Sequence, residues 1–200
     1  MDKELRDRLV AMATHDAAVR ERLAADGSLF DGYHPEMQAV HDANADEFEA
    51  ILLEQGWPDQ SLVAEDGSEA AWLIVQHAIA RPDLQRRVLT LLEAAAARGD
   101  VPAWQPAFLS DRIRTLEGRP QLYGTQFDWD ANGEMSPLPT EDPAGVDARR
   151  AGIGLPPLAE TIAHHRRQCE REPRPNDLEA RQRAMNLWAI RVGWRSGSAP

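Results

Sequence analysis

Residues 70–80, with the sequence AAWLIVQHAIA, constrain the fold of this chain more than any other stretch. They are apolar on every side of a helix, whereas a helix on the protein surface would show a polar stripe with a period of 3.6 residues. The stretch therefore predicts a buried helix that carries two polar side chains, Gln76 and His77, into or beside the core. Because a buried amide or imidazole without a partner costs about 1–3 kcal/mol, other segments must supply hydrogen-bonding groups.

The length and charge of the chain limit the classes of protein to which it can belong. Its 200 residues favour one domain with a sizeable core. Lys and Arg number 22 against 33 Asp and Glu, and the net charge of -11 disfavours nucleic acid and anionic membranes as partners. The N-terminus is charged and shows no secretory signal, and no apolar run reaches the roughly 18 residues of a membrane span. With a single cysteine, Cys169, the sequence predicts a cytoplasmic protein without an internal disulfide.

Apolar residues recur at helical spacing through most of the chain. In the helix predicted over 70–80, Ser68 is the expected N-cap. In the helix predicted over 35–55, the polar residues His41, Asp42, Asn44 and Asp46 are expected on the outer or flanking surface. The predicted helices span residues 2–25, 35–55, 70–80, 84–98, 102 or 106 to 117, 147–150, 157–172, and 176 or 177 to about 192.

Residues 121–138 change from a helical to an extended pattern. The run QLYGTQFDW alternates in part, DANG at 130–133 is a turn that can reverse a hairpin, and residues 134–138 return. Two strands alone are marginal in water, so the hairpin is expected to pack on helices. The predicted fold is mainly α, a single domain over residues 1–194 with about seven or eight helices and one small β-hairpin, followed by a disordered tail at 195–200.

The common cofactor and hydrolase motifs are absent from the sequence. It has no phosphate-binding loop, no dinucleotide GxGxxG, no HExxH, no Glu-x-x-His pairs of the di-iron type and no GxSxG elbow. Glu160, His164 and His165 offer metal ligands or an ion pair, but the run HHRRQCERE is more typical of a solvated helix end. His41 and Asp42 are adjacent and cannot share a helix face, so with Asp46 they have poor metal spacing. The sequence predicts no cofactor and no metal site.

Three segments place polar side chains beside strongly apolar ones: Gln76-His77, Asp111-Arg112 and the run from Gln121 to Gln126. In a functional interpretation His77 is the acid/base group, Asp111 orients it and Tyr123 donates a hydrogen bond. The predicted substrate-binding residues are Gln76, Arg112, Gln121, Gln126 and Trp57, with Arg112 as an anchor for an anionic group. In a structural interpretation the same side chains only brace a helix against the hairpin, and Asp111 pairs with Arg112 or Arg114.

The same motifs carry a resemblance to a known family. They are Gly56-Trp57-Pro58, Gln76-His77-Ala78, Asp111-Arg112 and the run QLYGTQ at 121–126. In these the chain resembles an uncharacterised bacterial family, a domain of unknown function whose members share a GWP turn, a QHA segment, a DR pair and a QYGTQ-like hairpin. Here one inserted leucine, Leu122, interrupts a contiguous QYGT. The resemblance covers about residues 44–150, or as far as Leu158, and implies one shared site without naming a reaction.

Two functions from different classes remain open. The first is an enzyme that acts on a small polar or anionic molecule by acid/base chemistry, hydrolysis or elimination, in a pocket around His77. It predicts that His77, Asp111 and Tyr123 converge. The second is a non-catalytic binding, regulatory or immunity-type protein whose acidic surface recognises a basic protein partner. It predicts no pocket and an exposed apolar patch rimmed by carboxylates.

Overall fold

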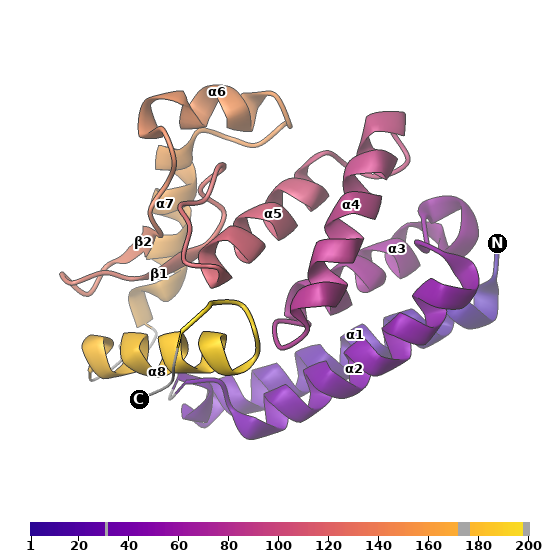
Figure 1. Cartoon of the computed structure of the whole chain (residues 1–200), viewed down its shortest axis with the longest axis horizontal. Coiled ribbons are helices and arrows are strands. Elements are labelled where there is room, and N and C mark those ends of the chain that lie inside the picture. The colour runs from indigo at the N-terminus through magenta and orange to yellow at the C-terminus, as the bar shows by residue number, and fades with distance from the viewer. Residues whose placement is uncertain (31, 172–176, 198–200) are drawn as a thin grey trace. The chain divides into compact units, whose positions relative to one another are not determined.

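The computed structural model describes residues 1–30, 32–171 and 177–197 (Figure 1). The chain divides into two compact units, Met1–Gln105 and Pro106–Pro200. Helices dominate both units and one small antiparallel hairpin accompanies them, which confirms the predicted mainly α class. The prediction of one domain over residues 1–194 stays a prediction. Within the described ranges, every helix is too short or too polar to cross a membrane.

Four helices and the start of a fifth form the first unit. The predicted bounds are confirmed within two residues for the first, second and fourth of them. Gly99 ends the fourth helix in the left-handed conformation, with a φ of 78°. The elements are α1 (Lys3–Ala25), a 3-10 turn η1 (Ser28–Phe30), α2 (Pro35–Gln55), α3 (Gln60–His77), α4 (Pro82–Arg98) and α5 (Trp104–Leu116), whose remainder belongs to the second unit.

Helices α1 and α3 lie side by side and run in the same direction. Near their starts, the backbone N–H of Asp2 donates to the carbonyl of Leu62 at 2.6 Å, and Arg6 Nε donates to Asp66 Oδ1 at 2.9 Å. Gly67 permits this close approach, because a Cβ at that position would lie 3.1 Å from Cγ of Arg6. The two helices are therefore held in register well before they reach the C-terminal half of α1, where the candidate site lies.

Helix α3 begins earlier than predicted. It starts at Gln60, because the side chain of Asp59 accepts hydrogen bonds from two backbone N–H groups of the first turn. The backbone leaves the helical conformation at Ala64, where φ is 61°, and the helix resumes after that residue, several residues before the predicted start at residue 70. The prediction of Ser68 as the N-cap is wrong, since Ser68 is buried inside the helix. The helix ends at His77 and not at Ala80.

The second unit holds the hairpin and the remaining helices. Its elements after α5 are β1 (Phe127–Trp129), β2 (Met135–Pro137), a 3-10 turn η2 (Pro143–Gly145), α6 (Val146–Ala151), α7 (Leu158–Gln168), a 3-10 turn η3 (Cys169–Arg171) and α8 (Leu178–Arg191). The strands are antiparallel, with Asp128 opposite Ser136. They are shorter than predicted, because residues 121–126 form a loop in which three backbone N–H groups point to one carboxylate. Successive N–H groups of a strand point in opposite directions and could not do this.

The C-terminal end of the described chain is held in place. Arg195, predicted as the start of a disordered tail, donates from Nε to the carbonyl of Leu116 at 2.8 Å and from Nη2 to the carbonyl of Thr115 at 2.9 Å. The predicted disorder of residues 195–200 stays a prediction, and residues 198–200 lie outside the described residues. Asp177 caps α8 by accepting from the N–H of Ala180, whereas the alternative cap, Asn176, also lies outside them.

Candidate functional site

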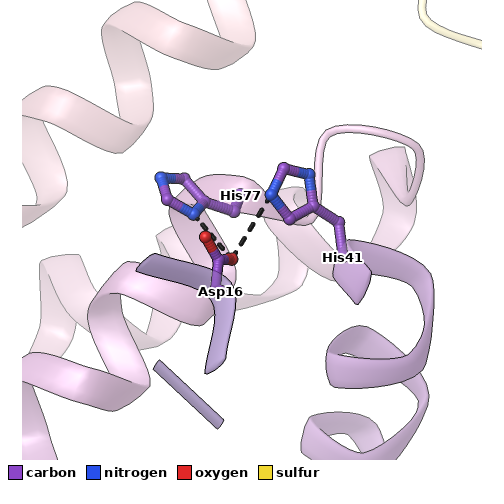
Figure 2. Close-up of side chains that lie close together, drawn as sticks. All are labelled: Asp16, His41 and His77. Atoms are coloured by element: carbon purple, nitrogen blue, oxygen red, sulfur yellow. Dashed lines mark hydrogen bonds and ion pairs between the residues drawn. The ribbon is translucent and has the colours of Figure 1, made fainter. Parts of the chain in front are cut away.

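Three helices of the first unit bring Asp16, His41 and His77 together (Figure 2). Nδ1 of His77 lies 2.9 Å from Oδ2 of Asp16, and Nε2 of His41 lies 3.3 Å from the same oxygen. The centroids of the two imidazole rings are 5.0 Å apart. One potential ligand atom from each residue lies within 4.8 Å of the others. This Asp16–His41–His77 centre joins residues that are far apart in the sequence.

Asp16 lies in the apolar stripe of α1. The buried residues of that helix recur every three or four positions and are Leu5, Leu9, Met12, Asp16, Val19 and Leu23. The side chain of Asp16 is only 2% exposed. Asp16 was not predicted as a site residue, although a signal was present: Met12 and Val19 in the apolar stripe are seven positions apart, and the carboxylate of Asp16 lies between them.

His41 points into the first unit and not to its outer surface. Its side chain is 10% exposed, and it lies seven residues before the buried Phe48 on the same face of α2. Asn44, one turn further along, is also buried. The predicted outer or flanking placement of these two residues is therefore wrong. Nδ1 of His41 is hydrogen-bonded to the hydroxyl of Tyr33 at 2.8 Å, and Tyr33 packs on an apolar cluster between α1 and α2.

Several polar atoms at and near the centre lack hydrogen bonds. Oδ1 of Asp16, Nε2 of His41 and Nδ2 of Asn44 are buried without a hydrogen-bond partner among the residues that the structure describes. The contact of His41 Nε2 with Asp16 is close enough for an ion pair but is not aligned as a hydrogen bond. A buried polar group left unpaired costs about 1–3 kcal/mol. Such groups in folded proteins commonly face an ordered water molecule or an ion.

The surroundings shift the pKa of two groups at the centre. Burial of Asp16 acts to raise the pKa of its carboxyl, but the contacts with His41 and His77 outweigh burial, so that the pKa lies well below its ordinary value. Burial, together with the negative charges of Asp42 and Asp16, raises the pKa of Tyr33. At neutral pH the centre therefore contains an ionised carboxylate and a neutral phenol.

The low pKa of Asp16 makes the stability of the first unit depend on pH. The pKa is lower in the folded than in the unfolded chain, so the stabilisation is complete above the unfolded pKa of about 4 and decreases as the pH falls toward the folded pKa. As the pH is lowered from about 5 to 3, the free energy of unfolding is expected to fall less in Asp16→Asn than in the wild type. Urea unfolding of metal-free protein at several pH values measures this.

A matched control for the acid dependence is Asp83→Asn, because the carboxylate of Asp83 is fully exposed. This variant is expected to follow the wild type at every pH. Equal pH slopes for Asp16→Asn and the wild type would show that Asp16 is not ionised through its contacts with the two imidazoles.

The predicted site residues are distributed over both units. His77, Gln76 and Trp57 belong to the first unit, where Gln76 is buried beside His77 and Trp57 packs edge-on against Phe48 with ring centroids 6.0 Å apart. The carboxylate that meets Nδ1 of His77 is Asp16. Asp111, Tyr123, Arg112, Gln121 and Gln126 belong to the second unit. The predicted convergence of His77, Asp111 and Tyr123 stays a prediction.

Asp111 organises the loop at residues 121–126. Its fully buried carboxylate accepts from the backbone N–H groups of Leu122 at 2.6 Å, Tyr123 at 3.1 Å and Thr125 at 3.1 Å. The hydroxyl of Thr125 adds a fourth donor at 3.0 Å. Arg112, the next residue on α5, is half-buried. The contacts of Asp111 are those of a residue that fixes a loop.

Gln121 braces the same loop against the segment that follows β2. Its Nε2 donates to the carbonyls of Gln126 at 2.9 Å and Leu138 at 2.8 Å, and its Oε1 accepts from the N–H of Gln126 at 2.8 Å. The side chain of Gln126 donates to the hydroxyl of Thr125 at 3.1 Å. These contacts agree with the structural interpretation of the two glutamines.

Arg150 is a buried residue of the second unit that the sequence analysis did not single out. It donates to the carbonyls of Tyr123 at 2.7 Å and Pro156 at 2.6 Å, and to the hydroxyl of Thr161 at 2.6 Å. Burial lowers the pKa of its guanidinium. Asp111 therefore accepts from N–H groups of the loop, while Arg150 donates to the carbonyl of Tyr123 in the same loop. Two side chains of opposite charge thus hold the loop.

A mostly apolar groove of about 590 Å³ lies along α1 and α3. Val10 and Ala13 line it from α1, and Trp72 and Leu73 line it from α3, where Trp72 packs edge-on against Trp104. The carboxylate residues Asp66 and Glu69 also line it. His77 is one helical turn beyond Leu73 on the same face of α3. Asp16, His41 and His77 are not among the residues that line the groove.

Comparison with known proteins identifies a family but no activity. The model of the family of unknown function DUF6624 matches residues 3–167. No curated protein and no solved structure matches the chain. The resemblance drawn from the GWP, QHA, DR and QLYGTQ motifs, to an uncharacterised family of unknown function, is confirmed.

Proposed function

Because the chain belongs to DUF6624, a family of unknown function, the family does not name an activity, and we propose one from the site itself. The protein is an enzyme that acts on a small polar or anionic molecule by acid/base chemistry. The reaction class is hydrolysis or elimination, and the reacting centre is formed by Asp16, His41 and His77. The observation that carries the proposal is that two imidazoles meet one buried carboxylate. The roles predicted for Asp111 and Tyr123 stay predictions from the sequence.

The chemistry of the centre suits proton transfer. A carboxylate that contacts an imidazole fixes its orientation and stabilises its protonated form, which is how acid/base histidines are commonly held. In hydrolysis, a base at the centre takes a proton from water, the water oxygen bonds to the electrophilic atom of the substrate, and the departing group receives the proton as its bond breaks. In elimination, the base takes a proton from carbon and the leaving group departs with the bonding electron pair.

The exposure of the three side chains supports a substrate approach at His77. Its side chain is 23% exposed, against 10% for His41 and 2% for Asp16. The groove beside Trp72 and Leu73 offers an apolar surface next to that approach. A small number of polar groups at the end of a mostly apolar concavity is the usual form of a small-molecule site. This favours a substrate with a polar reacting group and an apolar portion.

A second candidate function is a non-catalytic protein that binds a basic partner. It is favoured by the same groove, because Trp72, Trp104 and Leu73 form an apolar surface that carboxylate residues flank. Under this proposal the groove receives a protein segment, and the Asp16–His41–His77 centre only stabilises the first unit. The two candidates differ in what a substitution at His77 removes.

The enzyme proposal is tested with a panel of substrates and variants at the centre. The purified chain is assayed with carboxylic esters, amides, phosphate monoesters and hydroxy acids, with and without added divalent ions. We expect turnover of one class, and we expect His77→Gln and Asp16→Asn to lower kcat/KM for that class by at least about 100-fold, the range of acid/base contributions. Steady-state kinetics on folded variants measures this.

The matched control is His15→Gln, because His15 is exposed and adjacent to Asp16 on α1. It is expected to retain the wild-type kcat/KM. If no class is turned over under any condition, or if His77→Gln retains full activity, the enzyme proposal is wrong. Binding of a basic peptide that is lost in Leu73→Asp would then support the second candidate.

A further inference from the structure

We propose that Asp16, His41 and His77 bind one divalent transition-metal ion. The ligands are a carboxylate oxygen of Asp16, Nε2 of His41 and Nδ1 of His77, contributed by α1, α2 and α3 of the first unit. Two imidazoles and one carboxylate are a common ligand set for zinc and for iron(II). A metal site here was not predicted from the sequence, because Asp16 and His77 are 61 residues apart in the chain and His41 was expected on an outer or flanking surface.

Two of the three spacings between the donor atoms match those of ligands on one ion. With bonds of about 2.0–2.2 Å, two ligand atoms lie about 3.3 Å apart at a tetrahedral angle and about 3.0 Å apart at a right angle. Oδ2 of Asp16 lies 3.3 Å from Nε2 of His41 and 2.9 Å from Nδ1 of His77. All three donor atoms lie within 4.8 Å of one another, and His77, the most exposed residue, has room to adjust.

The unpaired atoms at the centre are those that an ion would satisfy. Nε2 of His41 and Oδ1 of Asp16 are buried without a hydrogen bond among the described residues. An imidazole nitrogen and a carboxylate oxygen without a hydrogen-bond partner are costly in a protein interior. A cation satisfies both, and it also removes the need for either imidazole to carry a proton toward Asp16.

Tyr33 orients His41 as a supporting residue does in known metal sites. Ligating histidines usually place their second ring nitrogen in a hydrogen bond, which fixes the tautomer and the ring. Nδ1 of His41 makes this bond with the hydroxyl of Tyr33 at 2.8 Å. When Nδ1 carries the proton and donates it to the phenol oxygen, the lone pair of Nε2 is directed to the centre. Tyr33 is thus a positioning residue and not a ligand.

The donor set selects the type of ion and deepens the proposed function. Imidazole nitrogens favour zinc and its first-row neighbours, whereas magnesium and calcium prefer oxygen ligands alone. Three protein ligands leave a coordination position for water, as in catalytic zinc sites. Binding rests on the geometry alone, and only the role of that water as the base of the reaction rests on the proposed function.

The experiment first removes metal from the full chain with a chelator and then titrates the chain with zinc. Isothermal titration calorimetry measures the binding. We expect one zinc ion per chain with a dissociation constant in the micromolar range or tighter, and no comparable binding of magnesium. His77→Gln, His41→Gln and Asp16→Asn are each expected to weaken binding by at least about 100-fold. Tyr33→Phe is expected to weaken it by about 10–100-fold, as supporting residues do.

The controls exclude other zinc ligands on the chain. His15→Gln and Cys169→Ser are expected to bind zinc as the wild type does, and so is His164→Gln, which alters the alternative ligand pair with Glu160. With cobalt(II) in place of zinc, the bound ion is expected to show no sulfur-to-metal charge-transfer band. Circular dichroism confirms that each variant is folded, and His77→Gln is the most secure of them because His77 is the last residue of α3.

The outcomes separate this proposal from the proposed enzyme activity. Zinc binding that is lost only in His164→Gln or Cys169→Ser, or that survives in His77→Gln and Asp16→Asn, overturns the metal site. Zinc binding at the centre without turnover of any substrate class retains the metal site and overturns the enzyme. If the metal-free protein turns over a substrate and binds no zinc, the enzyme proposal is retained and the metal site is overturned.

Discussion

Replacing Asp111 by asparagine is expected to lower the free energy of unfolding of the second unit by about 3–5 kcal/mol, as when one member of a buried charged network is removed. The carboxylate is fully buried and accepts from three backbone N–H groups and one hydroxyl. An asparagine keeps one oxygen and turns an NH2 group toward donors that it cannot satisfy. Arg150, on the other side of the loop, keeps the negative charge of Asp147 but loses that of Asp111.

Two measurements locate the effect of Asp111→Asn. Urea unfolding gives the total loss, and hydrogen exchange gives its position, since the amides of Leu122, Tyr123 and Thr125 are expected to lose protection first. Glu179→Gln is the control, because Glu179 is exposed and its ion pair with Arg183 within α8 is worth less than about 1 kcal/mol. Unchanged exchange at the three loop amides would contradict the role assigned to Asp111.

The helices could be predicted because their signals are local. Pro35 and Gly56 mark the ends of α2, and Gly99 ends α4, each through backbone preferences that do not depend on distant residues. The start of α3 was not predicted, because the strongest local signal lies several residues after the actual start. Asp59 is a good cap in itself, but Asp66-Gly67-Ser68 gave a stronger start signal. The glycine at position 67 is explained by the close approach of Val63 on the same helix and of Arg6 from α1, which the local sequence does not show.

The candidate site could be predicted only in part, since its members meet through packing and not through sequence spacing. His77 was identified because it interrupts an apolar stretch, and the same reasoning applied to α1 would have found Asp16 between Met12 and Val19. His41 gave no such signal, because Asp42 and Asn44 surround it with polar residues. The partner of His77 was sought in another polar pair, Asp111-Arg112, whereas the structure places a single carboxylate from the first helix against it.

Truncating Phe48 is expected to destabilise the first unit by about 3–5 kcal/mol, a large fraction of the roughly 5–15 kcal/mol that holds a domain folded. Phe48 is 0% exposed, packs edge-on against Trp57, and lies on the face of α2 that carries His41. Phe48→Ala removes the buried ring and leaves a cavity that rigid helices close only partly. Urea unfolding followed by tryptophan fluorescence measures the loss, with Trp57 as a probe beside the cavity.

The matched control for Phe48→Ala lies on the same helix. Leu53 is 78% exposed, so Leu53→Ala is expected to change the free energy of unfolding by less than about 0.5 kcal/mol. A loss in Phe48→Ala no larger than that in Leu53→Ala would contradict the assignment of Phe48 to the core of the first unit, because only the buried ring leaves a cavity when it is removed.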